Sequence, residues 1–260
     1  MKIEELKEYD GEDKITSSYE MEIELRKSNT SGIMVKSGLP SLDRALEGGF
    51  QTGELYAVSG ATKQGKTLLC QSITRNAHMS QNFALWFSYE VPARQFLSQF
   101  RELPLFYLPQ KLKTANMMWL EDRIMESFVK FHTRLVFIDH LHFLFDLFRS
   151  RNPSLEIGTV IRKLKTMAVE HDLIIFLLCH TSKAGGDAVT YQSIRDSSFV
   201  AQESDSVFLV ARTPKEGENT AALRVEFHRR TGVLEFFIKL HKVLGFLCEP
   251  PRPGQVGVPS

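Results

Sequence analysis

The stretch that most constrains this chain runs from residue 60 to residue 67 and reads GATKQGKT. It matches the pattern G-x-x-x-x-G-K-[ST] at every fixed position. Glycines in such a loop let backbone N–H groups turn toward phosphate oxygens, and the helix that follows adds its positive amino-terminal end. The predicted nucleotide-binding residues are Gly60, Ala61, Thr62, Lys63, Gln64, Gly65, Lys66 and Thr67. Within this set we expect Lys66 to reach the β- and γ-phosphates and the Thr67 hydroxyl to bind Mg²⁺.

A phosphate loop of this kind requires a strand before it and a helix after it, and the flanking sequence predicts both. ELYAVSG (54–60) is an apolar strand, and KTLLCQSITRNAHM (66–79) carries apolar residues at helical spacing. NFALWFSYE (82–90) is the next strand along the chain. The motif therefore lies in the context that a chance glycine-rich turn would lack.

The remaining apolar runs predict an α/β fold. RLVFIDH (134–140), DLIIFLLCH (172–180) and SDSVFLVAR (204–212) are nearly all apolar, as expected of parallel strands covered on both faces. They alternate with helical patterns at 92–102, 115–131 and 154–170, and ALRVEFHRR with GVLEFFIKL predicts a closing hairpin. We expect a mostly parallel central sheet with helices on both faces and a C-terminal antiparallel hairpin.

Composition suggests three parts. Residues 1–32 are charged and predict a flexible arm or linker helix, residues 33–247 an ordered domain that contains the phosphate loop, and residues 248–260, rich in proline, a disordered tail. At the start of the domain, Ser41 is expected to cap a short helix, LDRAL.

Bulk properties exclude some classes of protein. No apolar run approaches the roughly 20 residues of a membrane helix, and the acidic N-terminus lacks the pattern of a secretory signal. The expected compartment is the cytoplasm, with the mitochondrial matrix left open. Cys70, Cys179 and Cys248 are far apart, which argues against a disulfide framework and against a zinc site. The net charge of +1 neither supports nor excludes DNA binding.

Polar residues at the predicted strand ends are the candidates for chemistry beyond binding. Asp139 ends its strand where open α/β sheets place ligands, and its carboxylate is suited to Mg²⁺. Glu90 is suited to orienting or deprotonating a water, although a solvated Glu before Pro92 is an equal alternative. His180 is suited to sensing a γ-phosphate, although a lone histidine is more often structural.

The sequence HRR at 228–230 crowds three cationic or potentially cationic groups at the predicted hairpin turn. Such a group needs an anionic neighbour or open water. A solvated tip is the simpler reading, and an arginine delivered to the phosphate of another subunit is the functional one.

Together these segments resemble the ATPase domain of the DnaB-like ring helicases, within the RecA-like class, and especially the helicase half of phage and mitochondrial primase-helicases. The resemblance covers about residues 33–240. Its supporting segments, in chain order, are SGLPSLDRALEGGFQTGELYAVSGATKQGKT, FSYE, FIDHLHFL, the CH that ends the next strand, IRDSSFVAQESDSVFLVAR and HRRTG.

The resemblance implies a Mg²⁺-dependent ATPase, using ATP or another NTP, that forms a ring, expected to be a hexamer, and moves on single-stranded DNA while unwinding duplex. It implies Lys66 and Thr67 on phosphate and Mg²⁺ and Asp139 on the metal. Glu90 would activate water, His180 would sense the γ-phosphate, and Arg230 would reach the nucleotide of the adjacent subunit. The family commonly has Lys-x-Arg at that tip, so His228 departs from it and leaves Arg229 versus Arg230 open.

The resemblance also implies two DNA-binding loops near 146–154 and 181–191, with Arg149, Arg151 and Lys183 as phosphate contacts. A primase or other replication protein is an expected partner. No association with a membrane is expected. Two other readings stay open: a recombination mediator or KaiC-like regulatory ATPase that does not unwind, and a small-molecule kinase, which the absence of a clear arginine-rich lid segment disfavours.

Overall fold

The computed structural model describes residues 3–11, 13–27, 32–145, 153–180 and 197–251. The chain divides into two compact units, Met1–Ile33 and Met34–Ser260. The first unit contains α1 (Ile3–Lys7) and α2 (Ser18–Lys27), and neither helix has a buried residue. Before α2, the Ser17 backbone N–H donates to Glu20 and the Glu20 N–H donates to the Ser17 hydroxyl, a reciprocal cap that explains where this helix begins.

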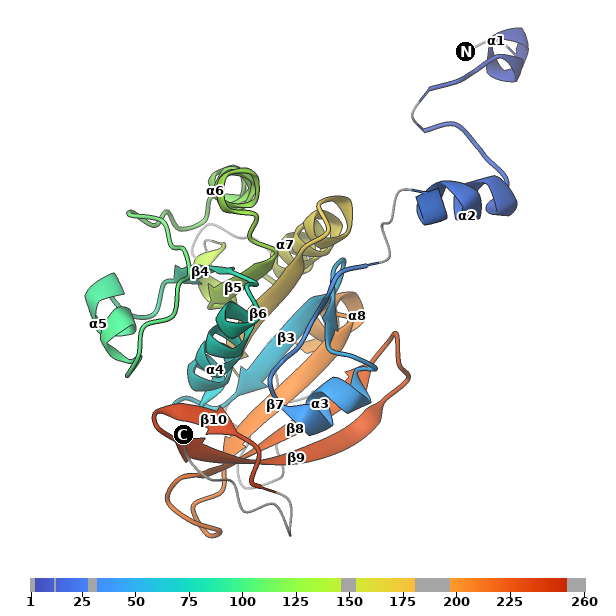
Figure 1. Cartoon of the computed structure of the whole chain (residues 1–260). Coiled ribbons are helices and arrows are strands. Elements are labelled where there is room, and N and C mark those ends of the chain that lie inside the picture. Colours follow the sequence, from blue (N-terminus) through green and yellow to red (C-terminus); the bar gives the residue numbers. More distant parts are fainter. Residues whose placement is uncertain (1–2, 12, 28–31, 146–152, 181–196, 252–260) are drawn as a thin grey trace. The chain divides into compact units, whose positions relative to one another are not determined.

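The second unit is built on an eight-stranded sheet (Figure 1). The sheet order is β10-β9-β8-β7-β3-β6-β5-β4, and the first five of these strands along the chain, β3 to β7, pair in parallel. From β7 onward the pairing is antiparallel, so the predicted closing hairpin is confirmed and extended by one strand. The strands are β3 (Leu55–Gly60), β4 (Ala84–Ser88), β5 (Leu135–Asp139), β6 (Ile174–His180), β7 (Ser206–Arg212), β8 (Thr220–His228), β9 (Leu234–Val243) and β10 (Phe246–Cys248).

Helices cover both faces of this sheet (Figure 1). Along β3 the buried side chains alternate: Tyr56 and Val58 pack with α3 (Pro40–Ala45), α4 (Lys66–Met79) and α5 (Ala93–Ser98). Leu55 and Ala57 pack with the opposite layer. That layer contains α6 (Met117–Phe131), α7 (Pro153–Glu170) and α8 (Ser197–Glu203). The predicted fold class, a mostly parallel sheet covered on both faces, is confirmed.

The strand register places the carboxyl ends of four neighbouring strands at one edge of the sheet. Gly60 of β3 pairs with His180 of β6, and Ser88 of β4 pairs with Asp139 of β5. A short 3₁₀ helix, η1 (Leu141–Phe143), follows β5 directly. The loops that leave these strands therefore surround a common space.

The helices predicted at 66–79, 115–131 and 154–170 are present, whereas the one predicted at 92–102 is limited to α5. Phe100 leaves the helix and packs its ring 5.1 Å from that of Phe106, within a buried aromatic group that includes Phe96. Packing thus shortens this helix relative to its sequence pattern. Among the described residues, no helix is long and apolar enough to cross a membrane.

The start of α3 differs from the expected cap. Leu39 is the N-cap residue and Ser41 lies in the first turn, where its backbone N–H and hydroxyl both donate to the Glu249 carboxylate at 2.6 Å. The expected Ser41 cap is therefore wrong, because a carboxylate distant in sequence satisfies the helix instead. Cys248, expected to open the tail, is the last residue of β10. A small antiparallel pair, β1 (Met34–Val35) and β2 (Phe50–Gln51), flanks α3 in the chain.

We predict that Glu249→Ala lowers the free energy of unfolding by about 1 kcal/mol, because it leaves a first-turn N–H of α3 without its acceptor. Urea unfolding followed by circular dichroism measures the change. Glu216→Ala, which removes an exposed carboxylate paired with Lys239, is the matched control and should cost less. Equal stability of wild type and Glu249→Ala would show that the carboxylate does not hold α3.

Candidate nucleotide site

The phosphate loop connects β3 to α4, as the motif requires. Gly60 and Gly65 have φ angles of 154° and 105°, which favour glycine. A Cβ at Gly60 would lie 2.4 Å from the Val210 carbonyl oxygen, so no other residue fits there without movement of β7. Gly65 is the N-cap of α4, and its conformation turns the loop into the helix.

Lys66 lies at the start of α4 with its ammonium inside the loop. Its Nζ donates to the carbonyl oxygens of Gly60, at 2.8 Å, and Ala61, at 3.1 Å, and lies 3.4 Å from His180 Nδ1. Burial lowers the pKa of Lys66, while the charges of Asp139 and Glu90 raise it. The Lys66 ammonium, held inside the loop, is suited to binding an anion that has several oxygen atoms.

Thr67 and Asp139 meet across the β3 and β5 ends, with the Thr67 hydroxyl donating to Asp139 Oδ2 at 2.8 Å. Asp139 Oδ1 is buried and accepts no hydrogen bond from the described residues. Burial raises the pKa of Asp139 to about 6, the Thr67 hydrogen bond lowers it, and the Glu90 charge raises it. A hydroxyl beside a carboxylate with a spare buried oxygen is a donor set that suits Mg²⁺.

Glu90 and His180 face the same space from the ends of β4 and β6. Glu90 is exposed just after β4, and His180 is the last residue of β6. Burial lowers the pKa of His180, as does the Lys66 charge, while the charge of Glu90 raises it. His140 lies with them, and burial lowers its pKa to about 3, with further lowering from His180.

Lys66, Thr67, Glu90, Asp139 and His180 line one cavity of about 530 Å³, a volume suited to a nucleotide, whereas His140 is not part of its lining. Its lining residues are Thr62, Lys63, Gly65, Lys66, Thr67, Leu68, Gln71, Glu90, Val91, Gln99, Asp139, His180, Lys242 and Gly245. Lys242 and Gly245 come from the end of β9 and the turn before β10, so the extended antiparallel part of the sheet supplies a further cation. A cavity of about 710 Å³ lies near Tyr107 and α6, but its lining contains none of the phosphate-loop residues.

Arg230 lies at the other end of the sheet from this cavity. Its Nε donates to Glu54 Oε1 at 2.7 Å, and its guanidinium donates to the carbonyl oxygens of Leu46 and Gly49, each at 3.0 Å. Glu54 precedes β3, whereas the phosphate loop follows it. Within one chain, Arg230 and Lys66 are therefore separated by the length of β3, about 16 Å at the usual rise per residue.

The hairpin tip at 228–230, for which a solvated position is the simpler of the two expectations, is only partly exposed. His228 is buried, with Nε2 3.6 Å from Glu54 Oε1 and its ring stacked on Tyr56 at 5.9 Å between centroids. Glu54 is thus the anionic neighbour that the cationic group needs. Arg229 is exposed, and its guanidinium donates to the Gln202 carbonyl oxygen.

Comparisons with known proteins identify the family of this chain. The profile of the DnaB-like helicase C-terminal domain matches residues 97–242, more than half of the chain, and that of the KaiC ATPase matches residues 35–106. The chain belongs to the DnaB-like helicase C-terminal domain family. It is accordingly an ATPase/helicase-type domain of the RecA-like class, as the sequence resemblance implies.

Solved structures share the fold of this DnaB-like domain. One, a DnaB-like replicative helicase studied with its interactions with primase, superposes with a TM-score of 0.73 at 17% identity, covering 93% of this chain and 69% of that one. Another, of an ATPase domain, gives 0.76 at 18% identity, covering 91% of this chain and all of that one.

Curated relatives match a shorter segment. The circadian clock oscillator protein KaiC of Prochlorococcus marinus strain MIT 9313 is 38% identical over 68 residues, and that of Synechococcus elongatus is 37% identical over 68 residues. The match covers 26% of this chain and only 14% and 13% of those proteins.

Within this DnaB-like domain, the structure brings Lys66, Thr67, Glu90, Asp139 and His180 together and places Arg230 apart. The predicted DNA contacts Arg149, Arg151 and Lys183 lie outside the described residues. Sequence reasoning missed His140, although it follows Asp139 directly, and Lys242, whose position depends on the unpredicted strand β10. It also missed Glu54, which carries no motif.

The Glu54 cluster predicts a pH-dependent contribution to stability. Burial would raise the pKa of Glu54, but its contacts with His228, Arg230 and Tyr56 lower it to about 2 from an ordinary value of 4.5. A carboxyl with a lowered pKa stabilises the fold fully above its unfolded pKa, and this stabilisation is lost as pH falls through about 2.

We predict that Glu54→Gln lowers the free energy of unfolding by about 2 kcal/mol at neutral pH, because it leaves Arg230 and His228 without a carboxylate. The difference from wild type should shrink between pH 4.5 and about 2, measured by urea unfolding. Glu226→Gln is the control and should cost less, since burial raises the pKa of this carboxyl and its partner Arg224 keeps a second carboxylate, Glu235, at 3.0 Å. Equal losses in both variants would contradict the assigned role of Glu54.

Proposed function

We propose that this chain is a Mg²⁺-dependent ATPase that assembles into a ring, expected to be a hexamer, and translocates on single-stranded DNA while unwinding duplex. The observation that carries the proposal is the convergence of Lys66, Thr67, Glu90, Asp139 and His180 on one cavity, with Arg230 at the opposite end of the same sheet. Such an arrangement suits a nucleotide held between neighbouring subunits.

In this proposal residues 60–67 bind the nucleotide phosphates. The Lys66 ammonium exchanges its contacts with the Gly60 and Ala61 carbonyl oxygens for β- and γ-phosphate oxygens. Thr67 and Asp139 hold Mg²⁺, which neutralises charge on the phosphates when bound. ATP is the expected nucleotide, although these contacts alone would accept another NTP.

Glu90 and His180 act at the γ-phosphate end of the cavity. Glu90 is exposed to the cavity and orients or deprotonates the attacking water. His180, 3.4 Å from Lys66 Nζ, changes its contacts when the γ-phosphate leaves. Because residue 181 follows it directly, the change passes to the predicted DNA loop at 181–191.

Arg230 supplies the other half of the site to an adjacent subunit, where its positive charge stabilises the transition state. Its Nε is held by Glu54, which fixes the direction of the guanidinium. Arg229 is the alternative because it is the more exposed of the two. The choice between Arg229 and Arg230 stays open, and Arg230 is the first candidate to test.

DNA and partner proteins complete the proposal. Arg149, Arg151 and Lys183 are the proposed contacts to the DNA backbone. A primase or other replication protein is a proposed partner, supported by the resemblance to a DnaB-like helicase studied with primase. The exposed side chains of Tyr19, Ile23 and Leu25 on α2 are candidates for contact with a neighbouring subunit.

A second candidate function is a KaiC-like or recombination-mediator ATPase that does not unwind DNA. The identity to KaiC across the phosphate-loop segment supports it, as does the low net charge. Both candidates share the nucleotide site, so only a DNA-coupled assay separates them.

We predict that single-stranded DNA raises ATP turnover severalfold, and that Lys66→Ala, Glu90→Gln and Arg230→Ala each lose this stimulated turnover by about 100-fold or more. Phosphate release measured with and without DNA gives the rates. Glu102→Gln, at an exposed position beyond α5, is the matched control for Glu90→Gln and should keep wild-type turnover. Full stimulated turnover in Glu90→Gln would exclude its assigned role.

We also predict that ATP, Mg²⁺ and single-stranded DNA together convert the purified protein into a ring that displaces a paired strand. Native mass spectrometry and a fluorescent strand-displacement assay measure the two properties. A protein that remains monomeric under these conditions would refute the ring. Ring formation and DNA-stimulated turnover without displacement would favour the second candidate.

A further inference from the structure

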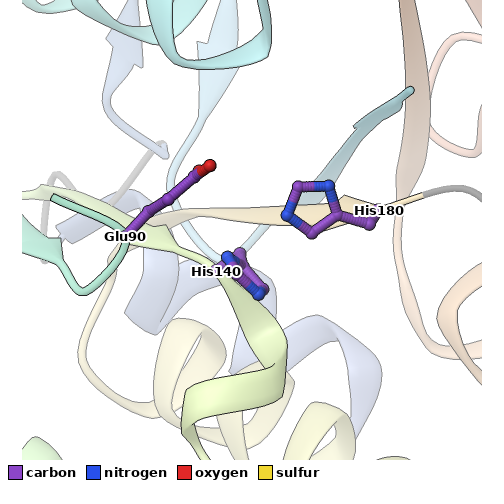
Figure 2. A group of neighbouring side chains, drawn as sticks. All are labelled: Glu90, His140 and His180. Carbon is purple, nitrogen blue, oxygen red and sulfur yellow. The ribbon is translucent and has the colours of Figure 1, made fainter. Parts of the chain in front are cut away.

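Glu90, His140 and His180 form a compact group of side chains (Figure 2), and two of them, Glu90 and His180, line the phosphate-loop cavity. Each offers one ligand atom, and the three atoms lie within 4.8 Å of one another. The residues follow or end three neighbouring strands, β4, β5 and β6, so the sheet itself holds them together. Among the described residues, this is the group of histidine, cysteine and acidic side chains that could surround a metal ion.

The chemistry of the three donors differs from that of the proposed Mg²⁺ site. Mg²⁺ prefers oxygen ligands and suits the Thr67 hydroxyl and the Asp139 carboxylate. Two imidazole nitrogens with one carboxylate suit a borderline ion such as Zn²⁺, which commonly takes three protein ligands and keeps a fourth position open. Two donor sets with different preferences therefore lie close together, and the cavity lining includes Thr67 and Asp139 of one set and Glu90 and His180 of the other.

His140 is the residue that the proposed hydrolysis does not use. Its Nδ1 is buried and has no hydrogen-bond partner among the described residues. Its ring meets that of His180 edge-on at 4.3 Å between centroids and packs against Phe143 at 4.9 Å. A phenyl ring could make the same packing contacts, so the nitrogen adds nothing to the packing.

We propose that Glu90, His140 and His180 bind a Zn²⁺ ion and that this binding blocks ATP hydrolysis. The binding step stands on the geometry of the three side chains, whereas its consequence rests on the proposed function. A Zn²⁺ ion held by Glu90 and His180 occupies the carboxylate that activates water and the imidazole that senses the γ-phosphate. Free Zn²⁺ would then inhibit ATP hydrolysis, because Glu90 and His180 cannot bind the ion and act in hydrolysis at the same time.

The first test is calorimetric titration of the nucleotide-free protein with ZnCl₂ in a weakly chelating buffer. Wild type should bind one Zn²⁺ with an affinity at least tenfold above that of His140→Phe. His78→Phe is the matched control, since His78 is also half-buried with an Nδ1 that has no hydrogen-bond partner among the described residues. This variant should bind as wild type does.

Absence of one-to-one binding by wild type, or equal binding by His140→Phe, would overturn the proposal. His140→Asn is a second variant, for the case in which the phenyl ring disturbs the fold, and should show the same loss. Thermal unfolding of each variant identifies a loss of structure.

The second test is ATP turnover at rising Zn²⁺ with Mg²⁺ held constant. Wild type should be inhibited, and His140→Phe should keep its basal turnover and need at least tenfold more Zn²⁺ for the same inhibition. Equal inhibition of both would overturn the blocking role. Zinc binding by a protein that hydrolyses no ATP would leave the site intact and refute the proposed function alone.

Discussion

The parallel pairing of β3 with β6, of β6 with β5, and of β5 with β4 is the constraint on which the rest of the site depends. Because these strands run in one direction, their carboxyl ends meet, and the loop after each one opens into the same space. Lys66, Glu90, Asp139 and His180 come from four separate stretches of sequence, and this register alone brings them together. Side chains packed on both faces of β3 hold the register.

The same sheet keeps Arg230 away from the phosphate loop of its own chain. The β7–β8 pairing returns the chain to the level at which β3 begins, where Glu54, His228 and Tyr56 surround the arginine. Glu54 directly precedes β3, and the other end of β3 leads into the phosphate loop. The Glu54 carboxylate also fixes the direction of the Arg230 guanidinium. In the proposed shared site, one copy of the chain would give its phosphate loop and a second copy would give its Arg230.

Sequence reasoning predicted the parts that depend on local pattern. The phosphate loop, the strands that end at Asp139 and His180, and the closing hairpin all follow from motif, apolar runs and turn residues. It missed interactions between distant residues: the Glu249 cap of α3 joins positions 208 residues apart, and Glu54 meets His228 across 174. Pairs of residues so far apart in the sequence leave no periodic pattern. Sequence reasoning also missed His140, because its neighbours Glu90 and His180 come close to it only after folding.

Mixing two inactive variants tests most directly whether the nucleotide site is shared between subunits. Lys66→Ala lacks the phosphate cradle but keeps Arg230, and Arg230→Ala lacks the arginine but keeps the cradle. An equimolar mixture should regain part of the DNA-stimulated ATP turnover, because some interfaces then pair an intact Lys66 with an intact Arg230. A mixture whose turnover equals the average of the two separate variants would contradict a shared site.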